Sequence, residues 1–356
     1  MPNSLPRRAR AVVALCIIAA VAMVTVVRLS SSGPSPRAAT LHATATGHPT
    51  VVPAPTAPAT TVAPTLPPTT VAPTTTTTAP PPTTAVPAPP APPPPPPAPV
   101  VPSGKGMWIW QPDQADGGDP NAIVARAKAT GLTHLYVRTG SSVDGFNASD
   151  FLNALLPVAH ANGIRVIGWD FPYFDDAEGD VVRALSAINY TTPSGDRIDG
   201  FSPDIETPGE GVALSAQAVY LYASALRANV GPSYLLIATV PRPSAYRIAD
   251  YPYGTIIQYM DAVAPMVYWI NQPPDQEAAD AVDYLSQFGK PVLPIGQAYD
   301  SGLEGGPPGA PTGDEIDAFI NAAQAHGAAG VSFWSWQHAS DDMWNAIAAA
   351  QEVGQH

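Results

Sequence analysis

The sequence predicts a (β/α)8 barrel over residues 104–356. Short runs of β-branched and aromatic residues alternate eight times with longer segments of helical periodicity. Gly131, Gly163, Gly289 and Gly327 each close a helical segment just before the next strand, where a residue with positive φ is favoured. A doubly wound open sheet is the alternative, but no GxGxxG fingerprint follows the first strand. Eight units in about 250 residues is typical of the barrel.

The expected elements follow in order along the chain. Strands are expected at 106–111, 133–139, 165–171, 200–206, 234–240, 262–269, 291–297 and 329–336. The helices expected between the strands include 121–130, 151–162, 215–229, 275–288 and 313–326. Thr312 and Glu315 have the spacing of a capping box before the last of these helices.

Residues 1–29 carry a targeting signal. The basic stretch RRAR precedes the apolar run 11–27, which fits either a signal peptide or a short membrane span. No small-x-small cleavage site follows directly, which favours a retained anchor with its N-terminus inside. We therefore expect export, with the domain on the outer face of the cell membrane or in the cell wall, or secreted if the leader is cleaved.

Residues 30–103 separate this signal from the barrel. Of the 45 prolines, 26 lie before residue 104, and threonine and alanine supply much of the remainder. Such a segment cannot bury a core, so it is expected to be a disordered, extended linker. Its composition suits a tether through a cell wall.

Charge and cysteine content exclude several functions. All 29 acidic residues lie in 104–356, whereas five of the 16 basic residues lie before it. An acidic domain disfavours binding to nucleic acid or to an anionic membrane surface. The one cysteine, Cys16, lies in the apolar run, which excludes disulfides within the chain and Cys-ligated metal sites. We expect a monomer that needs no metal and no cofactor.

The segment DGFSPDIE at 199–206 holds the strongest candidate site. Asp204 and Glu206 lie two positions apart, so on a strand they share one face. They end the fourth strand, and active sites of these barrels lie at the C-terminal ends of the strands. Pro203 lacks an N–H and indicates a bulge or an early end of the strand. In the alternative interpretation the pair only caps a loop or binds Arg138 or Arg165.

Further residues are expected at the same mouth. Tyr268 follows the sixth strand, and Met266 shares its face. The candidate substrate-binding residues are Asp170, Met266, Trp336, Trp110, Tyr173 and Tyr299. Aromatic faces pack on sugar rings and carboxylates bind sugar hydroxyls. Together these side chains predict a saccharide-binding cleft.

The segment resembles the glycoside hydrolase family 18 chitinases, which carry DGxDxDxE on the fourth strand. Asp199, Gly200, Asp204 and Glu206 fit this pattern, and Ser202 departs from it. Met266-Val267-Tyr268 resembles the M-x-Y of the sixth strand, and Trp334 or Trp336 the tryptophan of the eighth. The resemblance implies that Glu206 is the general acid, that Asp204 orients the 2-acetamido group, and that Tyr268 binds the acetamido carbonyl.

A second resemblance is to the family 25 muramidases, which also place D-x-E on strand four. DIET (204–207) and WQH (336–338) are similar to features of that family. An acid at the end of the first strand is usual there, whereas this chain has Trp110 and Gln111, with Asp113 a little later. The S-x-G-G of chitinase strand three is replaced by Ile167-Gly168-Trp169.

These features favour an exported glycosidase acting on N-acetylated amino-sugar polymers, either peptidoglycan or chitin-like. Two alternatives stay open. One is a non-catalytic saccharide-binding barrel, consistent with Ser202 and the changed strand-three motif. The other is a glycosidase acting on a different polysaccharide.

Overall fold

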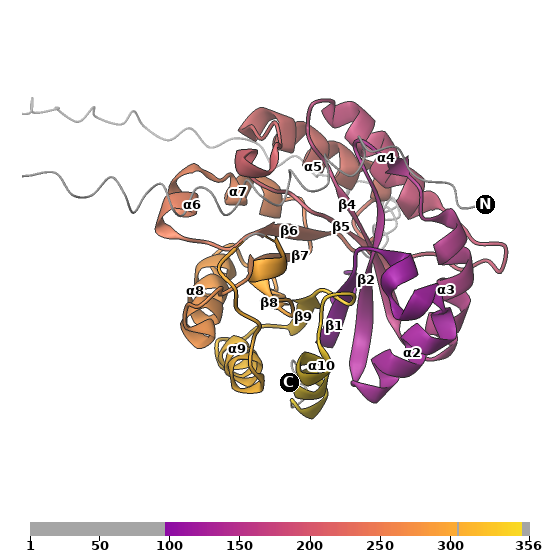
Figure 1. Ribbon diagram of the computed structural model, residues 1–356. Coiled ribbons are helices and arrows are strands. Elements are labelled where there is room, and N and C mark those ends of the chain that lie inside the picture. The colour runs from indigo at the N-terminus through magenta and orange to yellow at the C-terminus, as the bar shows by residue number, and fades with distance from the viewer. Residues whose placement is uncertain (1–96, 305, 351–356) are drawn as a thin grey trace, which may run out of the picture. The chain divides into compact units, whose positions relative to one another are not determined.

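The structure, a computed structural model, describes residues 97–304 and 306–350. It shows a ring of parallel strands surrounded by helices (Figure 1). The barrel strands are β1 (Gly104–Ile109), β2 (Leu132–Ser141), β4 (Arg165–Phe171), β5 (Gly200–Pro203), β6 (Ile237–Pro241), β7 (Ala262–Val267), β8 (Ile295–Gln297) and β9 (Gly330–Trp334). A short strand, β3 (Gly145–Phe146), pairs antiparallel with the end of β2.

The strand order around the sheet is β5-β4-β2-β1-β9-β8-β7-β6, and all of these pairings are parallel. The two ends of this order, β5 and β6, meet through isolated parallel bridges at Phe201–Leu236 and Asp204–Thr239. Phe201 N–H donates to Leu235 O at 3.0 Å, and Ile205 N–H donates to Thr239 O at 3.0 Å. The predicted eight-stranded barrel is therefore confirmed, and it closes at the seam between β5 and β6.

Helices follow the strands and cover the outside of the barrel (Figure 1). The α-helices are α2 (Pro120–Ala129), α3 (Ser149–Ala161), α4 (Ala177–Asn189), α5 (Ala216–Val230), α6 (Ala245–Asp250), α7 (Tyr253–Ile257), α8 (Pro274–Ser286), α9 (Gly313–Ala325) and α10 (Asp341–Ala349). Single turns of 3-10 helix are η1 (Pro112–Gln114), η2 (Asp116–Gly118), η3 (Pro208–Glu210) and η4 (Ser301–Glu304).

The predicted helix ends are confirmed. Thr312 and Glu315 form the reciprocal capping box of α9. The four glycines predicted to close helices have φ between 68° and 86°, a region that residues with a Cβ rarely adopt.

The predicted targeting segment at 1–29 lies outside the described residues, as does the predicted linker up to residue 96. Within 97–304 and 306–350, no helix has the length and apolar character needed to cross a bilayer.

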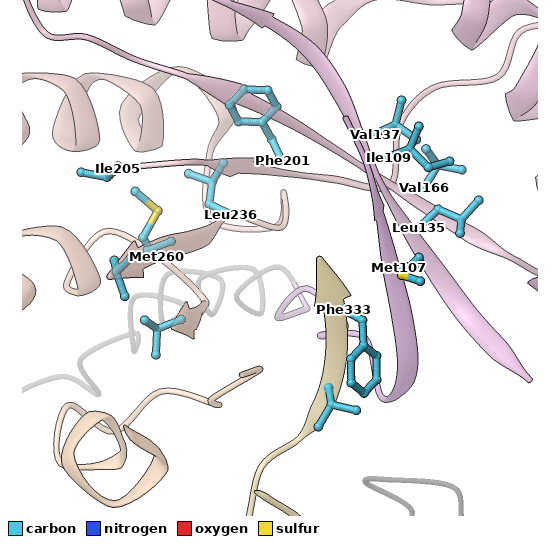
Figure 2. Packing of buried hydrophobic residues seen from close by; sticks show 14 of the residues in the cluster. Met107, Ile109, Leu135, Val137, Val166, Phe201, Ile205, Leu236, Met260 and Phe333 are labelled. Atoms are coloured by element: carbon cyan, nitrogen blue, oxygen red, sulfur yellow. The ribbon is translucent and has the colours of Figure 1, made fainter. Parts of the chain in front are cut away.

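Two apolar layers hold the barrel together. The outer layer packs the strands against the helices and includes Met107, Leu135, Val166, Phe201 and Phe333 (Figure 2). The inner layer fills the barrel with alternate residues of the same strands, among them Trp108, Tyr136, Trp169, Ile237 and Ile295. This alternation is the period of two expected of strands buried on both faces.

Aromatic rings dominate the inner layer. Trp108 lies parallel to Tyr136 with ring centroids 4.2 Å apart, and its Nε1–H donates to Ser332 Oγ at 2.9 Å. Trp169 Nε1–H donates to Ile109 O at 3.2 Å. The interior of the barrel is thus a packed core, and in barrels of this kind ligands bind at the C-terminal ends of the strands.

Strand β5 is shorter than the predicted 200–206, because it ends at Pro203. Pro203 has no N–H to continue the ladder, which explains the early end predicted from the sequence. Strands β6 and β8 also begin later than predicted, at Ile237 and Ile295.

Ser202 connects β5 to β6 by hydrogen bonds inside the barrel. Its side chain is fully buried. Its Oγ lies 2.9 Å from Ile237 O and 2.8 Å from Thr239 Oγ1, so it donates to the carbonyl and accepts from the threonine. The residue that departs from the chitinase pattern is therefore part of barrel closure.

We predict that Ser202→Ala lowers the free energy of unfolding by about 1–3 kcal/mol, because it leaves buried polar groups of β6 without a partner. Ser202→Asp should be at least as destabilising, since its carboxylate would face the Ile237 carbonyl in a buried site. Urea denaturation measures both changes. Ser186→Ala, at an exposed serine of α4, is the control and should stay within about 0.5 kcal/mol of wild type. Wild-type stability of Ser202→Asp would contradict this account of the seam.

Candidate active site

The two acids of the D-x-E motif directly follow β5, at the end of its contact with β6. Asp204 continues the inward register of Ser202, whereas Phe201 and Ile205 pack in the outer layer. Asp204 N–H donates to Asp170 O at 2.8 Å, which fixes the backbone against β4. The side chain of Asp204 is buried, and its Oδ1 has no hydrogen-bond partner among the described residues. Glu206 is half-buried. Asp204 is therefore closed off from solvent, whereas Glu206 is partly accessible.

Burial and like charge raise the pKa of both acids. Burial is the largest cause at Asp204, followed by the charges of Asp170 and Glu210, while Arg138 acts in the opposite direction. Burial also raises the pKa of Glu206 well above its usual value, and the charges of Asp204 and Glu210 add to it. Arg247 opposes this rise. Two carboxyl groups that interact this way titrate as a pair, and one proton is retained well above the usual range of an acid.

Glu210 is a third acid of this site that the sequence analysis missed. It ends η3, and the Thr207 hydroxyl donates to its carboxylate. Pro208 and Gly209 turn the chain directly after the motif, which is how an acid four residues beyond Glu206 affects both members of the pair. The turn-forming sequence T-P-G-E directly after the motif was the signal from which this acid could have been predicted.

No arginine forms an ion pair with Glu206 among the described residues. Arg138 pairs instead with Asp144 at 2.7 Å, and an Arg165 guanidinium N–H donates to Val100 O at 2.8 Å. The alternative in which Arg138 or Arg165 holds the motif as a structural pair is therefore not the arrangement observed.

Tyr251 fixes the backbone between the two acids. Its buried hydroxyl donates to Ile205 O at 2.5 Å, and it belongs to the segment between α6 and α7. The carbonyl lies midway in the D-x-E sequence, so this hydrogen bond holds both acids in place. Tyr251 was not among the predicted site residues.

Asp170 does not lie in the mouth, contrary to the prediction. Its neighbour Trp169 points into the barrel, so Asp170 points outward toward α4, where it is 1% exposed. There its Oδ2 accepts from Arg183 Nε at 2.8 Å, and Arg183 also pairs with Asp180 at 2.5 Å. Burial raises the pKa of Asp170 to about 6 despite this partner. Asp170 is a structural ion-pair residue behind the site.

The aromatic residues divide between mouth and core. Trp110 is half-buried beside Trp334, with centroids 6.1 Å apart, where β1 and β9 end. Trp336 is only 4% exposed and packs on Trp344 of α10 at 4.8 Å, outside the inner layer. The prediction that Trp336 faces the mouth is wrong, because β9 ends at Trp334 and the alternation stops there.

Met266 and Tyr268 both pack against the inner layer, so they share one face as the sequence predicts, and both are half-buried. Tyr299 is 3% exposed and meets Tyr268 edge to face, with centroids 5.5 Å apart. It therefore supports Tyr268 instead of presenting its own face, which corrects its predicted role. Tyr173 is half-buried and packs on Phe171 at 4.7 Å.

Asp204 and Glu206 directly follow β5, and Tyr268 directly follows β7, which carries Met266 near its end. Trp110 and Trp334 lie at the ends of β1 and β9, so all six residues lie at the C-terminal ends of barrel strands. Within the part of the chain that the structure describes, no group of three or more His, Cys, Asp or Glu side chains is arranged to hold a metal ion.

Comparison with known proteins gives the fold. No protein-family model matches the sequence, and no curated protein matches it. Two solved structures share a TM-score of 0.51. The C-terminal domain of a candidate chitinase from Desulfitobacterium hafniense is 12% identical, over 69% of this chain and 98% of that one. An endo-1,4-β-mannanase from Rhizomucor miehei is 11% identical, over 65% and 86%.

A family 18 chitinase from Flavobacterium johnsoniae is also similar, with 13% identity, 69% and 93% coverage, and a TM-score of 0.45. At identities this low, the similarity to these structures shows the barrel fold alone.

Proposed function

We propose that the domain is an exported glycoside hydrolase that cleaves N-acetylated amino-sugar polymers, either peptidoglycan or chitin-like. The observation that supports it most is the acid pair Asp204–Glu206, which lies at the C-terminal end of a barrel strand with the pKa of both groups raised. Glycosidases need one carboxyl group that keeps its proton near neutral pH and one that does not. The similarity of the barrel to those of glycosidases agrees with this proposal.

In the proposed reaction Glu206 is the general acid. It is half-buried, so it can both hold its proton and reach a bound glycosidic oxygen. It donates the proton to the leaving oxygen as the bond to the anomeric carbon breaks. The acetamido carbonyl of the substrate attacks that carbon, and water later completes hydrolysis with retention.

Asp204 and Tyr268 act on the acetamido group. When Glu206 holds the proton of the pair, Asp204 is the carboxylate that accepts a hydrogen bond from the acetamido N–H. Tyr268 lies on β7's side of the mouth and is held by Tyr299, and it donates to the acetamido oxygen. Trp110 and Trp334 form the apolar wall against which the sugar ring packs.

The experiment that tests the function incubates the full chain with purified peptidoglycan and, separately, with chitin oligomers. Released fragments are identified by mass spectrometry, which also gives the bond that is cut. Binding of either polymer without any cleavage would support the non-catalytic saccharide-binding barrel instead. Cleavage of neither, with activity on a polymer that lacks acetamido groups, would overturn the acetamido mechanism.

We predict that Glu206→Gln lowers kcat by about 10²–10⁴, because the amide keeps the shape of the side chain but has no proton to donate. The rate is measured on whichever polymer the wild type cleaves. Glu178→Gln, at an exposed acid of α4, is the matched control and should leave the rate unchanged. Circular dichroism checks that both variants are folded. A folded Glu206→Gln protein with the wild-type rate would remove this residue from the mechanism.

We predict that Asp204→Asn reduces activity and shifts its pH profile. The charge of Asp204 raises the pKa of Glu206, so its removal lowers that pKa. Activity that needs protonated Glu206 is lost as the pH rises through this pKa, and the basic limb should therefore move to lower pH. The measurement is kcat/KM against pH for both proteins. A basic limb that stays in place, or moves up, would refute the coupling.

Export is the remaining part of the proposal. It rests on the apolar run 11–27 and the proline- and threonine-rich segment that follows it. We predict that mild protease treatment of intact cells releases a fragment of about the size of the barrel, because an extended linker is the accessible cleavage site. Cleavage only after cell lysis would contradict export.

A further inference from the structure

A cavity lies between the chain after β1 and the chain after β9. Its volume is about 230 Å³. Its lining includes Gln114, Asp116, Arg126, Trp336, Gln337 and Trp344. Asp204, Glu206 and Tyr268 are not part of this lining, so the cavity, here called the Trp336 cavity, is separate from the acid pair.

One wall of the Trp336 cavity is a set of side chains that contact one another through polar groups. Arg126 binds Asp116 through two N–H groups, Nε to Oδ2 at 2.9 Å and Nη2 to Oδ1 at 2.7 Å. Trp336 Nε1–H donates to the same carboxylate at 3.2 Å. The Arg126 guanidinium also lies 5.3 Å from the ring centre of Trp344. These contacts fix the wall before any ligand enters, which reduces the entropy cost of binding.

Gln337 also lines the cavity, and its side-chain amide is not part of these polar contacts. Neither Oε1 nor Nε2 of its buried amide has a hydrogen-bond partner in the described part of the chain. A buried amide without partners is costly, and it needs one group that donates and one that accepts. Hydroxyl groups do both, so two neighbouring hydroxyls of one ligand satisfy the amide once it turns toward the cavity.

Size and charge restrict the ligand further. A volume of 230 Å³ is below the range of about 300–1,000 Å³ of pockets for drug-sized molecules, so there is room for a single ring. Arg126 is already neutralised by Asp116, and Asp341 adds a carboxylate to the lining. A phosphate or carboxylate ligand would be repelled. A neutral, ring-sized compound with neighbouring hydroxyls fits these limits.

We propose that the Trp336 cavity binds one neutral sugar ring of a polysaccharide, outside the catalytic mouth. The choice of a saccharide over another polyol rests on the proposed function. The proposal also accounts for the WQH segment at 336–338, whose tryptophan and glutamine contribute to the cavity instead of the mouth. A ring held here anchors a polymer chain on the same face of the barrel on which the mouth opens.

Hydrogen–deuterium exchange of the full chain tests this proposal, because it shows which segments of the backbone the bound sugar protects. Saturating N-acetylglucosamine should slow backbone exchange in 112–118 and 335–341, which border the cavity. Exchange in 204–211 reports the mouth separately. Protection at the cavity without hydrolysis of any polymer would reject the proposed function and keep the sugar site. Hydrolysis with no protection of 112–118 and 335–341 by any saccharide tested would overturn the sugar site alone.

Variants of two residues that line the cavity test which side chains contribute to the affinity for the sugar. Gln337→Leu removes the amide while keeping its bulk, and it should weaken the affinity measured from protection of 335–341 by about tenfold. Gln114→Ala, at an exposed residue of the lining, tests the same site without touching the buried amide. Gln258→Leu is the matched control at an exposed glutamine before β7, and it should bind like wild type. Wild-type affinity in both folded cavity variants would overturn the proposal.

Discussion

Closure of the barrel between β5 and β6 is the constraint on which the candidate site depends. Strand β5 has only four residues and ends at a proline, so the seam has few backbone hydrogen bonds. The Ser202 hydroxyl adds two contacts to β6 from inside the barrel. Asp204 is the next inward residue and bridges to Thr239 on the same seam. The acid pair is therefore placed by barrel closure, and whatever opens the seam also moves the acids.

The buried ion pair of Asp170 and Arg183 supports Asp204 on the side of β4. The backbone carbonyl of Asp170 accepts from Asp204 N–H, while the Asp170 side chain is held by Arg183. Removing one partner of such a buried pair leaves an uncompensated charge and costs about 3–5 kcal/mol. Asp170 thus connects the helix layer to Asp204, and the charge of Asp170 contributes to the raised pKa of Asp204.

The sequence predicted the barrel well because its signals are local. Alternating strand and helix periodicity, glycines at helix ends and the capping box each depend on a few neighbouring residues. The site was predicted less completely. Trp336 was misplaced because the alternation of strand faces stops where β9 ends. Asp170 was misplaced because the inward Trp169 makes its neighbour face outward. Glu210 and Tyr251 reach the acids through a turn and a distant loop, which no periodicity encodes.

Glu210 also bears on the serine that interrupts the chitinase-like motif. A carboxylate at position 202 would be fully buried and would face the Ile237 carbonyl, so the seam favours a hydroxyl there. The motif thereby lacks one negative charge next to Asp204. Glu210 supplies a negative charge from the turn after the strand, and it raises the pKa of both Asp204 and Glu206. Burial is the largest cause of the raised pKa of Glu206, and the charges of Asp204 and Glu210 add to it. A carboxylate at position 202 is therefore not required to raise that pKa, and Ser202 is compatible with the proposed role of Glu206 as general acid.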